Sequence, residues 1–259
     1  MPSNYAHYRF GVTILPTLPG DVRRTIQRFR RLFDVGLHGP DIFYYQPLLT
    51  KGTNRFLGIK FHEQSGRDFF PRVCRTVRME KSEAAQAYLY GLLLHYCLDS
   101  VCHPFVEEQT KLGPARHAQI ETEFDRYLLE LDGKVPPCIQ DLSPHLKLTP
   151  GECETVAKFY PGTSGNTIKA CLNNMGNTLR LLTVPEGPRR LVLRKTMELA
   201  GFGDMVMHCG PDSSCAQLNE PFLARYEEAA AHVPEMLAQL QANMTYNAPF
   251  EDEFQANFG

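Results

Sequence analysis

Residues 82–121 read SEAAQAYLYGLLLHYCLDSVCHPFVEEQTKLGPARHAQIE, and they carry the clearest helical signal in the chain. The first half is rich in Ala, Leu and Tyr, without the strict polar and apolar alternation of a half-buried strand. Ser82 is a suitable N-cap, and Glu83 places a negative charge in the first turn. Because Pro104 disfavours helical backbone at the residue before it, we expect the helix that begins here to end near His103.

The rest of the chain has the same helical character, and convincing strands are absent from the pattern. Residues 134–151 hold four prolines and are expected to be loop. Further helices are predicted over 20–33, 115–132, 166–183, 188–200 and 219–243. We therefore predict an all-α, multi-helix bundle forming a single domain over residues 1–259, with candidate metal ligands within 1–130 and a helical remainder over 150–245.

The composition excludes several classes of protein. A chain of 259 residues is one large domain or two small ones, at roughly 150 residues per domain. Its 27 basic and 29 acidic side chains give a net charge of -2, which does not favour duplex nucleic acid as a partner. The longest apolar runs span only a few residues, whereas a transmembrane helix needs about 20. No transmembrane segment is therefore expected.

The N-terminal residues and the cysteines bear on the compartment. The chain begins MPSNYAHYRF, which lacks the basic start and apolar stretch of a signal peptide. Eight cysteines are scattered without a C-x-x-C pair. We therefore expect a cytoplasmic protein whose cysteines are reduced and mostly buried, with no thiolate zinc site.

Candidate metal ligands are concentrated in residues 95–121. His95, Asp99 and His103 stand at positions i, i+4 and i+8, and drift only about 40° per step around a helix. Along the helix axis the two histidines are roughly 12 Å apart. Zinc–nitrogen bonds measure about 2.0–2.1 Å, so these histidines cannot easily bind one ion. More than one metal is the simplest solution, with Asp99 serving a metal other than the one on His103.

His117 and Glu121 form a second pair, one turn apart on a second helix, where both can bind a single ion. Two such pairs on adjacent helices can face each other across a bundle core. Histidine and carboxylate ligands without cysteine suit zinc, and also manganese or iron. A lone pair of this kind is usually a surface contact or a satisfied core histidine, but two pairs together with His103 favour metal binding.

The pattern His95-x3-Asp99, then His103, then His117-x3-Glu121 resembles the zinc-dependent phospholipase C family, which is similar to the single-strand-specific zinc nucleases. The resemblance covers roughly residues 5–130. It implies an all-α fold with a site for two or three Zn²⁺ ions, and further ligands at His7, Asp41 and His62.

The resemblance also implies a distribution of the ligands. Asp99 would bridge two zinc ions, of which one is bound by His7. The third ion would be held by His103, His117 and Glu121. The ion on the other side of Asp99 would be held by Asp41, His62, His95 and Asp99. Asp41 would also be the catalytic residue that orients or deprotonates a bridging water.

These observations lead us to expect a metal-dependent phosphoric-ester hydrolase similar to phospholipase C, in which a metal-bound hydroxide attacks phosphorus. Its substrate would be a small phosphate ester or a phospholipid head group. Two alternatives stay open at this stage: a nuclease-like or other phosphodiesterase, and a non-catalytic metal-binding or scaffold protein. The sequence specifies neither the head group nor the oligomeric state.

Several residues near the predicted ligands receive other interpretations. His38 could donate a hydrogen bond to Asp41, although a partly exposed loop histidine is commoner. Tyr44 and Tyr45 could line the pocket, but packing in the core is the commoner role and is expected here. Glu63 and Glu123 are expected on the surface, because adjacent helical positions point about 100° away from the ligands. The aromatic tail is expected to pack back onto the protein through Phe250, Phe254 and Phe258.

Overall fold

The computed structural model describes residues 4–46 and 57–259. These residues form α-helices and short 3-10 segments, and the only strand-like pairing among them is an isolated bridge between Ser65 and Asn257. The prediction of an all-α, multi-helix fold is therefore confirmed. Among the described helices, none is long and apolar enough to cross a membrane.

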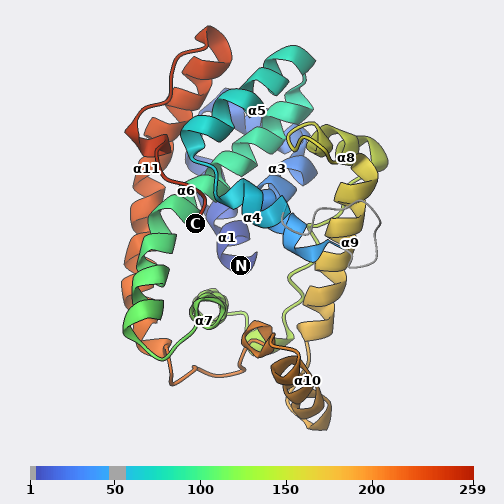
Figure 1. The fold of residues 1–259 in the computed structure, drawn as a ribbon, viewed down its shortest axis with the longest axis vertical. Helices are drawn as coiled ribbons and strands as arrows, with labels where there is room; N and C mark the ends of the chain where they lie inside the picture. Colours follow the sequence, from blue (N-terminus) through green and yellow to red (C-terminus); the bar gives the residue numbers. More distant parts are fainter. Residues whose placement is uncertain (1–3, 47–56) are drawn as a thin grey trace.

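Figure 1 shows two long helices, α6 and α11, running side by side, with the shorter helices around them. The α-helices are α1 (Asn4–Ile14), α2 (Gly20–Arg28), α3 (Arg30–Gly36), α4 (Leu57–His62), α5 (Gly66–Glu80), α6 (Glu83–Leu112), α7 (His117–Leu131), α8 (Pro150–Ala157), α9 (Gly165–Leu182), α10 (Pro188–Leu199) and α11 (Asn219–Tyr246). The 3-10 segments are η1 (Leu15–Thr17), η2 (Gly39–Tyr45), η3 (Pro137–Ile139), η4 (Gly203–Met205), η5 (Ala216–Leu218) and η6 (Asp252–Phe254).

Helix α6 begins where the sequence predicts, because the Ser82 hydroxyl accepts a hydrogen bond from the Ala85 N–H. Its predicted end near His103 is wrong: the helix continues through Pro104 to Leu112. Beyond the proline, Val106 is fully buried and the ring of Phe105 packs against Phe222 of α11. This packing outweighs the local cost of an interior proline, which removes one backbone hydrogen bond.

Close backbone contact between α3 and α6 positions the segment that carries Asp41. A side chain at Gly91 would bring its Cβ within 2.3 Å of the Phe33 carbonyl oxygen, so the two helices need glycine at their crossing. The chain then turns at Gly39, whose φ of +45° favours glycine and whose Cβ would lie 2.3 Å from His95 Cδ2. Segment η2 is thereby held directly over His95.

The C-terminal tail packs back onto α5 and α6, as the sequence predicts. Phe250, Phe254 and Phe258 are all buried, and Phe254 stacks on Tyr96 of α6. The Tyr96 hydroxyl also donates a hydrogen bond to the Ala256 carbonyl at 2.9 Å. The tail is thus fixed along its length against the helix that carries His95 and Asp99.

Two cysteines are joined, so the expectation that all eight are reduced is wrong. Cys138 and Cys209 form a disulfide across a sequence separation of 71 residues. The other six cysteines are free and buried. The sequence pattern did not indicate this pair, because the two loops that carry it meet only through the packing of the helices between them.

Candidate metal centre

The first group of candidate ligands is built by α1 and α6. Asp99 lies between two histidines, with its Oδ1 3.1 Å from His7 Nε2 and its Oδ2 3.0 Å from His95 Nε2. All three side chains are buried. One carboxylate thus reaches two imidazoles with different oxygens, which is the arrangement a bridging ligand needs.

The second group adds residues from η2 and α4. Asp41 Oδ1 lies 2.9 Å from His62 Nε2, and both side chains are buried. His95 belongs to this group as well as to the first, because Asp41, His62 and His95 each offer a ligand atom within 4.8 Å of the others. The two groups are therefore joined through one imidazole.

The third group joins α6 to α7. Glu121 Oε1 lies 3.3 Å from His103 Nε2 and 3.2 Å from His117 Nε2. His103 Nε2 is also 3.9 Å from Asp99 Oδ1, which places this group beside the first. Most of these ligands line one cavity of about 270 Å³; its lining consists of His7, Asp41, Tyr44, His62, Asp99, His103, His117, Ala118, Glu121 and Gly259.

Three histidines are oriented in the same way, each by a main-chain carbonyl. Nδ1 of His62 lies 2.7 Å from the Gly58 oxygen, and Nδ1 of His95 lies 3.2 Å from the Leu37 oxygen. Nδ1 of His103 lies 2.6 Å from the Phe258 oxygen. A carbonyl can only accept, so each Nδ1 donates and each Nε2 is the nitrogen that faces the carboxylates and would bind a metal. Fixing the tautomer in this way is how proteins prepare histidine for a metal.

The innermost atoms of the site fit a shared cation. His95 Nε2 and Asp99 Oδ2 face each other at 3.0 Å as an ion pair, and among the described residues neither atom makes a well-aligned hydrogen bond. Leaving a buried polar atom unsatisfied costs about 1–3 kcal/mol. An ion bound by both atoms would remove this cost, and nitrogen and oxygen are donors that zinc accepts. The residues present therefore suit the metal.

Histidine neighbours keep the buried carboxylates ionised. Burial disfavours the charge on Asp99, but His95, His103 and His7 outweigh this effect and hold its pKa well below the usual range. Burial also opposes ionisation of Glu121, and hydrogen bonds with His103 and His117 help to bring its pKa well below normal. Metals bind carboxylates in the ionised form, so these environments favour ligation.

Three of the neighbouring residues depart from the sequence interpretation. His38 Nε2 contacts His145 Nε2 at 2.6 Å rather than donating to Asp41. Glu123 is buried, not exposed, because it holds the buried guanidinium of Arg126 at 2.9 Å. Tyr44 borders the metal cavity instead of packing in the core, and 39 % of it is exposed.

Sequence reasoning also missed the contribution of the tail to the site. Phe258 supplies the carbonyl that orients His103 across 155 residues, and its ring lies near His62 and His95. No local spacing links residues so far apart. The aromatic repeat in the tail indicated that it packs against the protein, but not where it packs.

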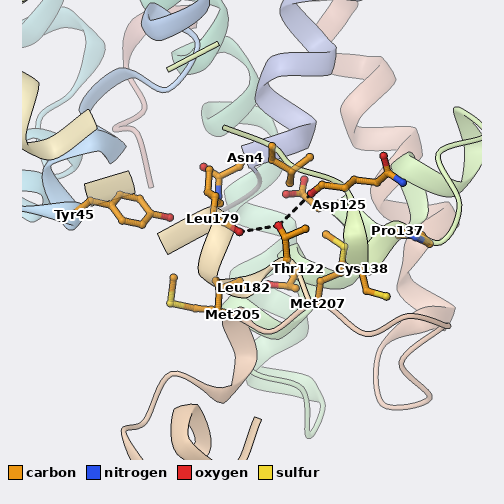
Figure 2. A pocket seen from close by; sticks show the side chains of 13 residues that line it. Asn4, Tyr45, Thr122, Asp125, Pro137, Cys138, Leu179, Leu182, Met205 and Met207 are labelled. Atoms are coloured by element: carbon orange, nitrogen blue, oxygen red, sulfur yellow. Dashed lines mark hydrogen bonds between the residues drawn. The ribbon is translucent and has the colours of Figure 1, made fainter. Parts of the chain in front are cut away.

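A second cavity supports the site indirectly. Figure 2 shows Asp125 and Thr122 of α7 beside the sulfur atoms of Cys138 and Met207. Asp125 accepts hydrogen bonds from the N–H groups of Tyr5 and Ala6, so it caps the start of α1, the helix that carries His7. Burial raises the pKa of Asp125 to about 7. This cavity measures only about 50 Å³, against about 270 Å³ for the metal cavity.

Comparison with known proteins agrees with this geometry. No curated protein and no solved structure matches the chain significantly. A family model described as zinc dependent phospholipase C matches residues 6–158, which is more than half of the chain and includes all eight candidate ligands. The match also extends beyond the segment that the sequence pattern covers, into α8. The chain therefore belongs to the zinc-dependent phospholipase C family.

Proposed function

We propose that the protein hydrolyses a phosphoric ester with the help of two or three zinc ions. The observation that carries this proposal is the buried contact of His95 Nε2 with Asp99 Oδ2, two atoms without a well-aligned hydrogen bond where the groups of ligands meet. Family membership supports a hydrolase of the phospholipase C type. The substrate in this proposal is a small phosphate ester or a phospholipid head group.

The proposed ligands follow the three groups. Asp99 is the bridge between His7 and His95, since its two oxygens face different imidazoles. Asp41 and His62 complete the group around His95. The remaining ion belongs to His103, His117 and Glu121.

The zinc ions and the surrounding side chains have different roles in the proposed hydrolysis. Bound zinc ions supply Lewis-acid stabilisation of negative charge on the phosphoryl oxygens. Three carboxylates, those of Asp41, Asp99 and Glu121, oppose a formal charge of about +6 from three zinc ions, which leaves the cavity attractive to phosphate. Asp41 is held by His62 at 2.9 Å and is the proposed base that orients or deprotonates the attacking water. Tyr44 stands at the border of the cavity, where it can contact the substrate.

A comparison of substrates tests this proposal against its alternatives. Zinc-loaded protein should hydrolyse a phosphocholine ester faster than single-stranded DNA, and a chelator should abolish the activity. Preference for single-stranded DNA would indicate a nuclease instead. Full zinc loading with no turnover on a broad panel of phosphate esters would indicate a metal-binding or scaffold protein.

Replacing Glu121 tests the third group of ligands. Glu121→Gln keeps the size of the side chain but removes the charge shared by His103 and His117, so we expect bound zinc to fall by about one equivalent. Elemental analysis of the dialysed protein measures this loss. Glu130→Gln changes a partly exposed carboxylate on the same helix and should keep the full zinc content. Equal zinc in both variants would remove the third ion from the proposal.

The disulfide bears on where the protein works. Disulfides form and persist mainly in oxidising compartments, whereas the cytoplasm keeps thiols reduced. We therefore infer that the bond between Cys138 and Cys209 favours an oxidising compartment over the cytoplasmic location expected from the sequence.

A further inference from the structure

Helix α10 exposes apolar side chains that an ordinary surface helix would bury. Its outer side exposes Leu191, Val192 and Leu199, which are 61 %, 66 % and 91 % exposed. Its inner side buries Arg190, whose guanidinium donates hydrogen bonds to the carbonyls of Val184 and Met207. Surface helices normally turn the apolar stripe inward and the charges outward. The outward stripe is therefore not explained by the core of this chain.

The exposed aliphatic side chains form one stripe. At 100° per residue, Leu191, Leu199 and Val192 fall within about 100° of one another around the helix, and Lys195 lies between them. Phe202, just beyond the helix, adds a further aromatic side chain that is 56 % exposed. Figure 1 shows α10 projecting from the lower end of the molecule, and the side chains of the stripe are exposed there.

Positive charge is concentrated on the same helix. Four basic residues and one acidic residue, Glu198, give α10 a formal charge of +3, although the whole chain carries -2. Arg189 and Lys195 are exposed, and Arg194 lies 3.9 Å from Glu198. Lysine is depleted in the centre of protein–protein interfaces. At a bilayer, by contrast, its aliphatic stem can lie among apolar groups while its ammonium reaches the head groups.

We propose that α10 docks on the surface of a bilayer that contains anionic lipid. The helix lies in the plane of the interface, where Leu191, Val192 and Leu199 enter the acyl boundary and Lys195 contacts lipid phosphate. With 12 residues α10 is far too short to span the membrane. None of its residues lines the metal cavity, so docking is independent of zinc.

Flotation of the full chain with lipid vesicles tests this surface. The protein should float with vesicles of phosphatidylcholine and phosphatidylserine, and less with phosphatidylcholine alone, and added salt should weaken the binding. Leu191→Gln combined with Leu199→Gln should weaken binding by about tenfold or more. A matched control, Met79→Gln with Tyr246→Gln, changes side chains that are 72 % and 82 % exposed on α5 and α11 and should bind like the parent.

Two flotation results would overturn the proposal. In one, the parent protein does not float with the vesicles; in the other, the α10 double variant and the control variant bind the vesicles equally well. Equal melting temperatures of the two variants establish that the α10 variant is folded. Binding should persist in a chelator, which separates this result from failure of the zinc hydrolase proposal. Sedimentation analysis without lipid tests a different occupant of the stripe. If the parent protein is a dimer and the α10 double variant is a monomer, a second copy of the chain covers the stripe and the proposal is wrong.

Discussion

Asp99→Asn is expected to release more than one zinc ion and to abolish hydrolysis. Asp99 uses both oxygens, one at 3.1 Å from His7 and one at 3.0 Å from His95, and it is the proposed link between two ions. The amide has nearly the same shape but no negative charge, and one of its two terminal atoms is a donor. Removing a residue that only orients a metal ligand typically lowers activity by about 10–100-fold. The loss of activity in Asp99→Asn should be larger.

Elemental analysis of zinc per chain measures this effect together with the hydrolysis rate. Asp34→Asn is the matched control, because Asp34 is a buried aspartate of α3 that pairs with Arg30 at 2.6 Å outside the site. The control should keep its zinc. A zinc content in Asp99→Asn that equals that of Asp34→Asn would refute the bridging role.

Phe258→Ala is expected to destabilise the protein and to loosen the third group of ligands. The ring is fully buried against Phe69 and Tyr96, and truncating a buried phenylalanine costs about 3–5 kcal/mol of unfolding free energy. The same residue presents its carbonyl to His103 at 2.6 Å. Once the ring no longer anchors the backbone, zinc affinity at His103 should fall by about 10–100-fold.

Phe254→Ala separates the effect on stability from the effect on the metal. Phe254 is also fully buried in the tail, where it packs on Phe70 and Tyr96, and no described ring contact joins it to a candidate ligand. Chemical denaturation should give a similar loss of stability for both variants. Competition with a zinc chelator should show weaker binding in Phe258→Ala alone. Equal zinc affinities would mean that the tail is only structural.

Local spacing accounts for the part of the site that the sequence could predict. Asp99 stands one turn from His95, and Glu121 one turn from His117, so helical geometry alone places each pair together. His7, Asp41 and His62 come from three other segments, and only the family resemblance indicated them. The structure brings these residues together, with His95 buried behind the cavity that the others line, and the variants of Asp99 and Glu121 test the roles of those two carboxylates as ligands.

Tertiary packing accounts for most of what the sequence did not predict. Pro104 is a local signal for a helix end, but the packing of Phe105 and Val106 beyond it carries α6 onward. The pairing of Cys138 with Cys209 and the contact between Phe258 and His103 likewise join residues far apart in the chain. The organisation of residues 1–259 as a single domain stays a prediction.

Anomalous diffraction at the zinc edge, from crystals of the zinc-loaded protein, is the most direct test of the proposed site. We predict two or three peaks in the cavity, with one beside Asp99 between His7 and His95 and another among His103, His117 and Glu121. An empty cavity in fully loaded protein, or ligand side chains that diverge toward solvent, would contradict this prediction.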